Sequence, residues 1–462
     1  MVPLLDPLPP SLKRSSLLVH SAIVLSSFWG VTALAMALNP QSFWKFFTVP
    51  TVVPPVTSSL SYYWDIQAYA NLALQPQCSA FYPLWPTLIR LGFQPTTTLE
   101  AAQAFLQVAT LLSVVAVPLI LILFRQAFQN DRLALGMALL YSLSPLAIFR
   151  VIGYTESLFS LLGILLLLLL RWTPSPRLVP WIGIGVGMLA AFLALLRPTL
   201  PQMLSSSVAT LLTLGGVTWA EHRNPARLNP PSPDLSFWEQ FQRRCPLALP
   251  VTLALIIGTI VGYSLYGGFC WRTTGDFFGP FSQQSLWNKS LGFRPWLLFT
   301  SRSPLLDLWG LYLPPLLWLA ALGQVGQALG YCQMPSLRGG LGGWILSLYP
   351  PLWMVVQTWG RSLGGTPSSP ATPLPPWAGE YGVWFALYFA ASHGAIVFLT
   401  QDRLVSLGRY IFAQPFVFLA LGYLYPHLDR HHQRFLWPTL LGISSLHLLN
   451  QWVRYGYHQW LG

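Results

Sequence analysis

The sequence predicts an all-α protein whose helices cross a membrane many times. Hydrophobic residues make up 53% of the 462 residues, charged residues make up only 8%, and the mean hydropathy is +0.52. Soluble domains carry about 25% charged residues, so the low charge argues against a soluble fold. The apolar residues fall in long runs, and one membrane span needs about 20 of them. We therefore expect a single domain over residues 1–462, built as a helical bundle of roughly 11–12 such spans.

The first predicted span runs from about Leu17 to Leu38 and follows the basic pair Lys13 and Arg14. This run is longer than the apolar core of a signal peptide, which is about 7–15 residues, and more apolar runs follow it. We expect it to be retained as a helix. Because basic residues favour the cytoplasmic side, its N-terminus is placed there.

The first outer loop is expected to cover residues 39–98. Proline and threonine at 50–55 argue against a helix in its first half. A short amphipathic helix is expected from Asp65 to Leu74, lying along the membrane surface. Trp64 and Tyr69 suit the depth of the lipid headgroups, where aromatic residues gather.

The remaining apolar runs are expected to cross the membrane in turn. They are Ala101–Phe124, Leu133–Ile148, Thr155–Leu170, Pro180–Leu196, Leu200–Ala220, Leu247–Phe269, Leu305–Gly330, Tyr381–Thr400, Tyr410–Tyr425 and Leu436–Trp452. The run Trp344–Trp359 is either a span or a re-entrant segment. Between the spans we expect a cytoplasmic loop at 221–246, an outer loop at 271–302 and a Gly/Pro/Ser-rich loop at 360–378. This pattern predicts an integral, multi-pass protein of a bacterial plasma membrane, or of the endoplasmic reticulum in a eukaryotic host.

The net charge of +12 does not point to a nucleic-acid partner. The basic residues are scattered between the spans and form no basic run with interleaved aromatics. Basic residues at the ends of loops instead set the orientation of a membrane protein. We therefore expect membrane lipids, and not nucleic acid, to surround this chain.

The four cysteines are Cys78, Cys245, Cys270 and Cys332. None forms a C-x-x-C pair, which argues against a zinc or redox site. Cys78 and Cys270 fall on the predicted outer side, so a disulfide between them is one alternative. We favour two free thiols for this pair.

Asp65 is the strongest candidate for a chemical role. Only 13 residues are acidic, and this one lies among aromatic residues just outside a predicted span. A carboxylate held at the boundary between water and lipid is well placed to take a proton from a substrate. We therefore favour a functional role for Asp65 over a merely solvated one.

Other charged residues fall on the same predicted side, at the outer ends of helices or in outer loops. They are Arg150, Glu156, Arg197, Asp276 and Lys289. The cations suit an anionic substrate, because Arg and Lys bind phosphate through charge-assisted hydrogen bonds. Charges at helix ends are often simply solvated, and for any one of them taken alone we favour that interpretation.

Several sequence blocks resemble the PIG-V family, which includes the second GPI mannosyltransferase and many bacterial relatives. The first block holds Trp64-Asp65, Tyr69-Ala70 and the segment AFYPLWP at 80–86. The later blocks stand in the same order as in the family, at 154–162, 196–199, 275–278 and 409–416. Together the blocks extend from residue 62 to residue 416, which is most of the chain.

The resemblance implies a GT-C type glycosyltransferase fold. Members of the family transfer a hexose, here expected to be mannose, from a polyprenyl- or dolichyl-phosphate donor. The acceptor is expected to be a lipid-linked glycan or another hydroxyl compound on the non-cytoplasmic face, in a pathway like GPI-anchor biosynthesis. Such enzymes are typically metal-independent, so the resemblance implies no metal and no cofactor besides the donor lipid.

The resemblance also implies roles for individual residues. The first outer loop carries the catalytic acid of the family, and this role falls on Asp65 as general base. Arg197 and Arg409 would steady the departing lipid phosphate, and Glu156 would orient Arg197 or the sugar. The other residues expected to bind substrate are Trp64, Tyr69, Phe81, Tyr82 and Asp276.

Arg409 receives two conflicting placements from the sequence. Counting spans puts it on the cytoplasmic side, whereas the resemblance puts it near the active-site face. We prefer the second placement, which makes Trp344–Trp359 non-spanning.

The main alternative function is a secondary transporter or a lipid-sugar flippase. It would use Asp65, Glu156 and Arg197 as coupling groups. Transporter sites usually lie near the membrane midplane at broken helices. The acids here are predicted at outer helix ends, which favours the enzyme.

Overall fold

The computed structural model describes most of the chain and is built from helices. The described residues are 14–39, 64–171, 178–223, 236–285, 289–301, 303–329, 374–401, 404, 406–427, 430–457, 459 and 461. Within these ranges no β-strand forms, and one isolated bridge pairs Lys289 with Gln401. The prediction of an all-α fold is confirmed.

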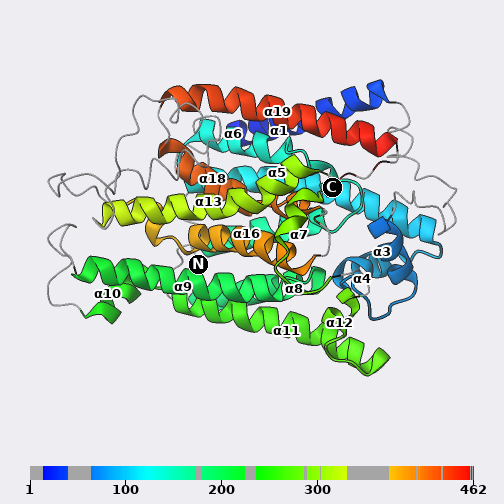
Figure 1. The fold of residues 1–462 in the computed structure, drawn as a ribbon, viewed down its shortest axis with the longest axis horizontal. Coiled ribbons are helices and arrows are strands. Elements are labelled where there is room, and N and C mark those ends of the chain that lie inside the picture. Colours follow the sequence, from blue (N-terminus) through cyan, green and yellow to red (C-terminus); the bar gives the residue numbers. More distant parts are fainter. Residues whose placement is uncertain are drawn as a thin grey trace.

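Seven helices in the described ranges are long and apolar enough to cross a membrane. They are α1 (Arg14–Leu38), α5 (Thr98–Phe128), α8 (Val179–Leu196), α9 (Leu200–Arg223), α11 (Ala248–Thr274), α13 (Pro304–Ala328) and α16 (Tyr381–Thr400). They run roughly along one common direction in a single bundle (Figure 1). The chain is therefore an integral multi-pass membrane protein, as predicted.

Other helices complete the bundle and its ends. The α-helices among them are α3 (Trp64–Leu74), α4 (Leu84–Phe93), α6 (Asp131–Ser142), α7 (Glu156–Arg171), α10 (Phe237–Arg244), α12 (Gly279–Ser285), α17 (Leu407–Phe412), α18 (Phe416–Leu424) and α19 (Arg430–Gly456). The 3-10 helices are η1 (Ala147–Arg150), η4 (Pro295–Phe299), η5 (Pro376–Gly379) and η6 (Tyr425–His427). The predicted short helix of the first outer loop is present as α3.

Two predicted spans are broken in the middle. The run 133–148 forms α6, which ends at Ser142, and then η1. The run 410–425 forms α17 and α18, which are separated by a turn that ends at Pro415. Pro145 and Pro415 lack a backbone N–H, and each disfavours a helical conformation in the residue before it. The prediction of continuous helices is wrong for these two runs, and both breaks place polar groups inside the bundle.

Glycines allow α8 and α11 to pack closely. A Cβ atom added at Gly258 would collide with the backbone of Gly187, and one added at Gly262 would collide with the backbone of Ala191. Close approach through small residues is typical of helix pairs in membranes. This contact fixes the position of α8 against α11. Arg197 is the C-cap of α8, so its position follows from the same packing.

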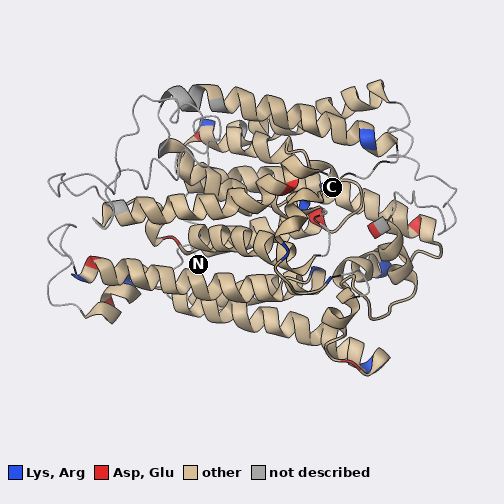
Figure 2. Cartoon of the chain, in the orientation of Figure 1, with Lys and Arg blue, Asp and Glu red and all other residues tan. Residues whose placement is uncertain are grey.

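The two ends of the bundle carry different short helices. Helices α3, α4 and α12 lie at one end, and α10 lies at the other (Figure 1). Charged residues are sparse, and a small group of them lies inside the bundle (Figure 2). Arg243 and Arg244 lie in the last turn of α10, and Arg223 lies in the last turn of α9. Because basic residues favour the cytoplasm, the α10 end is the predicted cytoplasmic end.

Some predicted segments lie outside the described residues. They are residues 40–63 of the first outer loop, residues 224–235 of the loop at 221–246, the run Trp344–Trp359 and residues 360–373 of the loop at 360–378.

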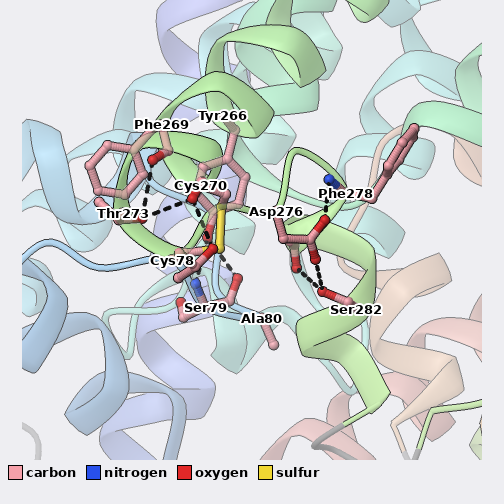
Figure 3. The surroundings of a disulfide bond; sticks show 12 residues. Cys78, Ser79, Ala80, Tyr266, Phe269, Cys270, Thr273, Asp276, Phe278 and Ser282 are labelled. Carbon is pink, nitrogen blue, oxygen red and sulfur yellow. Dashed lines mark hydrogen bonds between the residues drawn. A yellow bond between two sulfur atoms is a disulfide. The ribbon is translucent and has the colours of Figure 1, made fainter.

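A disulfide joins Cys78, between α3 and α4, to Cys270 in α11 (Figure 3). Their Cα atoms lie 4.9 Å apart, within the usual range for a disulfide. The Tyr266 hydroxyl supports the same contact, since it donates to the Ser79 carbonyl oxygen at 2.6 Å and accepts from the Ser79 backbone N–H at 3.0 Å. Our preference for two free thiols is wrong, because the fold brings together two positions 192 residues apart.

Candidate active site

Asp65 lies in the first turn of α3, at the end of the bundle that carries α4 and α12. A carboxylate is favoured there by the positive end of the helix dipole. Its side chain is 18% exposed, and its Oδ2 atom lies 2.8 Å from the Nη2 atom of Arg409. Arg409 therefore holds one oxygen of a carboxylate that is still partly exposed to a substrate.

Glu156 joins two arginines in the interior. It lies in the first turn of α7 and is fully buried. Its Oε1 atom accepts hydrogen bonds from both Arg197 and Arg409. Arg197 also donates from Nε to the Thr155 hydroxyl at 2.9 Å. Asp65, Arg409, Glu156 and Arg197 therefore form one connected set, which we call the charge cluster.

The charge cluster is electrically balanced. Two carboxylates face two guanidinium groups, and they come from α3, α17, α7 and the C-cap of α8. Removing ionised groups from water costs several kcal/mol for each ion, and only close pairing offsets this. The pairing explains why four charges can lie together in the interior of the bundle.

Aromatic rings enclose both guanidinium groups. The guanidinium carbon of Arg409 lies 4.4 Å from the centre of the Tyr154 ring and 4.6 Å from that of Phe149. That of Arg197 lies 5.1 Å from the Tyr410 ring. Rings in this arrangement attract the cation and fix the plane of the guanidinium group.

The position of Glu156 depends on a turn between η1 and α7. Gly153 has φ of +89°, a conformation that residues with a side chain rarely adopt. The indole Nε1 of Trp85 donates to the Gly153 carbonyl oxygen at 3.0 Å, and Trp85 is fully buried. The segment at 80–86 therefore supports the turn that carries Glu156. The sequence alone predicted no role for Trp85.

The position of Arg409 depends on Asp307, which the sequence analysis missed. Asp307 lies in the first turn of α13 and is 1% exposed. Its Oδ1 atom accepts from the Gly408 backbone N–H at 2.9 Å, and its Oδ2 atom accepts from the Ser301 hydroxyl at 2.6 Å. An acid within an apolar run is a signal of function by itself, and that signal could have found it.

Three predicted aromatic residues lie near α3. The Tyr69 ring packs edge-on against Phe81, with centroids 5.2 Å apart. Burial, aided by the charge of Asp65, raises the pKa of the Tyr69 hydroxyl above its usual range, so the hydroxyl stays protonated. Tyr82 is buried, and its ring lies 4.9 Å from that of Tyr266. The side chain of Trp64 lies outside the described part of the chain.

An apolar groove of about 220 Å³ begins at Phe81. One side is formed by the α3–α4 region, including Leu72 and Pro83. The other side is formed by α8 and α11, including Leu195 and Leu265. Phe81, one of the residues that line the groove, packs against Tyr69, which follows Asp65 by four residues on α3.

Asp276 lies apart from the charge cluster. Its Oδ1 atom accepts from the Phe278 backbone N–H at 2.8 Å, and its Oδ2 atom accepts from the Ser282 hydroxyl at 2.6 Å (Figure 3). These contacts order the turn that leads into α12. None of its contacts with described residues reaches the charge cluster, so substrate binding by Asp276 stays a prediction.

The location of Arg409 corrects the span count. The count put this residue on the cytoplasmic side, but its side chain pairs with Asp65. The count treated residues 133–148 as one crossing ahead of Arg409, whereas this run divides into α6 and η1. The placement that we preferred, near Asp65, is the one that the structure has.

Metal ligands do not gather in the described residues. No group of three or more His, Cys, Asp or Glu side chains in those ranges is arranged to hold a metal ion. The four residues of the charge cluster pair with one another. What the cluster offers chemically is a partly exposed carboxylate and two oriented guanidinium groups.

Comparisons with known proteins give low similarity. No protein-family model matches the chain, and no curated protein matches it. Among solved structures, it is similar to the oligosaccharyltransferase AglB from Archaeoglobus fulgidus in complex with an inhibitory peptide and a dolichol-phosphate. That match has a TM-score of 0.39 and 13% identity, over 92% of this chain and 56% of the other. A second structure of an Archaeoglobus fulgidus oligosaccharyltransferase, tethered to an acceptor peptide, matches with a TM-score of 0.37 and 12% identity. That match covers 94% of this chain and 55% of the other.

The chain thus spans about half the length of the solved enzymes that it matches. Identity and overlap at this level assign no role to individual residues. The roles proposed below therefore follow from the contacts within this chain and from its sequence blocks.

Proposed function

We propose that the chain is a membrane glycosyltransferase of GT-C type. It would move a hexose, with mannose favoured by the PIG-V resemblance, from a polyprenyl- or dolichyl-phosphate donor. The acceptor would be a hydroxyl group of a lipid-linked glycan or of another compound. The observation that carries the proposal is the pairing of Asp65, a partly exposed carboxylate, with the buried Arg409, which Glu156 links to Arg197.

The order of the sequence blocks supports this function. Asp65, Glu156, Arg197 and Arg409 come from four different blocks of the PIG-V resemblance, far apart in the chain. Their side chains nevertheless meet in one cluster. Four blocks that converge on one site are expected of a catalytic centre and not of four unrelated helix ends.

Asp65 is proposed as the general base. Arg409 holds its Oδ2 atom and so fixes the carboxylate, which is partly exposed. The acceptor hydroxyl would give its proton to Asp65 as its oxygen attacks the anomeric carbon of the donor. The lipid phosphate would leave from the opposite side, so the anomeric centre would be inverted.

Arg197 and Arg409 are proposed to stabilise the departing phosphate. The Nη1 atom of Arg197 has no hydrogen-bond partner among the described residues. A guanidinium group fixed in advance stabilises developing negative charge without reorganisation, which is how such groups lower a barrier. Glu156 would hold both cations in place and would not act as a second base. The reaction as proposed needs no metal and no further cofactor.

The apolar groove is proposed to hold the polyprenyl chain of the donor. An isoprenoid chain is fully apolar and is stabilised by an apolar surface that faces the membrane. Phe81 lies in this groove and contacts Tyr69, one helical turn from Asp65. A lipid bound with its phosphate end at Phe81 would present the phosphate toward α3, the helix that carries Asp65.

The disulfide supports an active site on the non-cytoplasmic face. Disulfides persist in oxidising compartments and are rare in the cytosol. Cys78 lies in the segment that joins α3 to α4, so it is close in sequence to Asp65. The basic residues of α10 lie at the opposite end of the bundle. The disulfide and the basic residues both support a reaction in which the donor and the acceptor meet outside the cytoplasm.

The test is sugar transfer by purified protein in detergent micelles, where no gradient exists. Polyprenyl-phosphate with a labelled mannose is mixed with a lipid extract as acceptor, and the labelled product is identified by mass spectrometry. The proposal predicts transfer under these conditions. A protein that transfers nothing in micelles but moves the lipid-linked sugar across sealed vesicles under a gradient would instead be a transporter or flippase.

A further inference from the structure

Arg150 differs from the other buried arginines. Within the described residues the buried arginines are Arg125, Arg150, Arg197 and Arg409. Three of them form an ion pair with a carboxylate. Arg150 is 3% exposed, and no carboxylate of the described residues pairs with it. A buried charge without a counter-charge is costly, so its surroundings must supply compensation.

Part of that compensation comes from α6. The Nη2 atom of Arg150 donates to the carbonyl oxygen of Tyr141 at 2.6 Å, in the last turn of the helix. The guanidinium carbon also lies 3.6 Å from the centre of the Tyr141 ring. The C-terminal end of a helix is equivalent to roughly half a negative charge. It therefore balances only part of the charge of Arg150.

The remaining hydrogen-bonding capacity lies at a small cavity. The Nη1 atom of Arg150 and the hydroxyl of Ser142 have no partner among the described residues, and both side chains line this cavity. Ser142 is 4% exposed. The rest of the lining is mostly apolar and includes Phe28 of α1 and Val117 of α5. Guanidinium N–H groups only donate, and a hydroxyl also donates, so the cavity suits an acceptor.

The size of the cavity limits the ligand. Its volume is about 20 Å³. A cavity needs about 10–15 Å³ of such volume to hold one water molecule, so this cavity accommodates about one particle of that size. Phosphate, sulfate and carboxylate groups have several heavy atoms and exceed this room. A monatomic ion fits, and the donors that face it require that the ion be negative.

We propose that this cavity, between α1, α5 and α6, is a binding site for a halide ion, with chloride as the physiological ligand. Arg150 supplies the charge and one N–H donor, and Ser142 supplies a hydroxyl donor. None of the four charge-cluster residues lines the cavity, so the site is separate from the proposed active site. The inference does not rest on the proposed function.

The site would stabilise η1. Arg150 is the last residue of this short helix, and Phe149 beside it packs against Arg409. A halide that completes the contacts of Arg150 holds η1 against α1 and α6. The expected effect is higher thermal stability in chloride.

The first experiment compares chloride with gluconate at equal ionic strength and pH. Unfolding of the purified protein in micelles is followed by tryptophan fluorescence. Chloride is expected to raise the unfolding midpoint by a few degrees, with a saturable dependence on concentration. Arg150→Gln should abolish this shift, and Arg272→Gln, which removes an equal charge at an exposed site in α11, should retain it. Equal midpoints of the wild-type protein in the two salts, or a chloride shift that persists in Arg150→Gln, would overturn the proposal.

The second experiment needs no variant and decides the case if Arg150→Gln does not fold. Crystals of the wild-type protein are soaked in bromide, and the anomalous signal is measured. The proposal predicts a bromide peak in contact with Nη1 of Arg150. A bromide-free site that holds only water there contradicts it.

Discussion

Glu156 is the residue on which the charge cluster depends. One of its oxygen atoms accepts from both Arg197 and Arg409, and the other has no partner among the described residues. The side chain is fully buried, so water cannot replace it. Two guanidinium groups therefore share one counter-charge, and Asp65 balances the second.

The first prediction concerns the charge of Glu156. Glu156→Gln leaves two buried guanidinium groups with a single carboxylate, and loss of one partner of a buried ion pair typically costs about 3–5 kcal/mol. We expect the free energy of unfolding to fall by about that amount and sugar transfer to be lost. Glu239→Gln is the matched control, because Glu239 lies in the exposed capping box of α10, where Gln also serves. Thermal unfolding in micelles checks this, and a Glu156→Gln protein as stable as wild type would contradict it.

At the residue scale the sequence identified the charges and offered Arg197 as a partner of Glu156, but it did not predict the contacts of Arg409 with Asp65 and Glu156. Asp65, Glu156, Arg197 and Arg409 were all candidates, since charged residues near membrane spans are rare. The pairing of Arg409 depends on how α17 lies against α13, a contact between residues far apart in the chain. Asp307 was missed because it lies inside an apolar run that was interpreted only as a span.

At the scale of elements, α17 is the helix whose position matters most. It has only six residues, so its own hydrogen bonds hold it weakly. Asp307 of α13 compensates by accepting from the backbone N–H of Gly408, the residue before Arg409. The carboxylate thus acts as a cap supplied by a neighbouring helix. Asp307 is a positioning residue, because it reaches Arg409 only through the backbone.

The second prediction follows from this contact. Asp307→Ala removes the acceptor of the Gly408 N–H and lets Arg409 shift, and a shift of about 1 Å in a reacting group can cost on the order of 100-fold in rate. We expect kcat for sugar transfer to fall by about that factor while KM for the donor changes less. Asp307→Asn keeps one acceptor oxygen and should restore part of the loss. Equal activity of the alanine and asparagine variants would contradict the positioning role.

The two broken helices are the elements whose continuity hydropathy did not predict. Hydropathy shows an apolar run at 410–425 but does not show that Pro415 ends one helix and begins another. The same holds for 133–148, which divides into α6 and η1. The long uninterrupted helices were predicted well because their length alone defines them.

At the scale of the whole molecule, the disulfide links distant parts of the chain. It ties the α3–α4 segment to α11 across 192 residues. Both of these parts line the apolar groove. The crosslink therefore holds the two sides of the groove together at the end of the bundle that carries Asp65.

The third prediction tests this crosslink. A disulfide that closes a long loop usually stabilises a protein by about 2–5 kcal/mol. The double variant Cys78→Ser with Cys270→Ser should lose stability of about that size, and reducing agent should have no further effect on it. Cys245→Ser serves as control, since Cys245 is a buried free thiol. If reduction of the wild-type protein left its unfolding midpoint unchanged, the stabilising role would be wrong.

For the whole molecule, the sequence was enough to predict an all-α, multi-pass protein, because composition and run length determine that class. It was also enough to place the short helix α3 and the candidate Asp65. It was not enough to predict the disulfide or the convergence of α3, α7, α8 and α17 on one cluster. These depend on contacts between residues far apart in the chain, which one sequence does not reveal.

The most direct measurement is sugar transfer by Asp65→Asn in micelles, with labelled polyprenyl-phosphate mannose as donor. Asparagine keeps the shape of the side chain and can still accept from Arg409, but it cannot take up a proton from the acceptor. A general base typically contributes about 10²–10⁴-fold to the rate, so we predict a loss in that range with Glu239→Gln unaffected. An Asp65→Asn protein that transfers sugar at the wild-type rate would contradict the central role of this carboxylate.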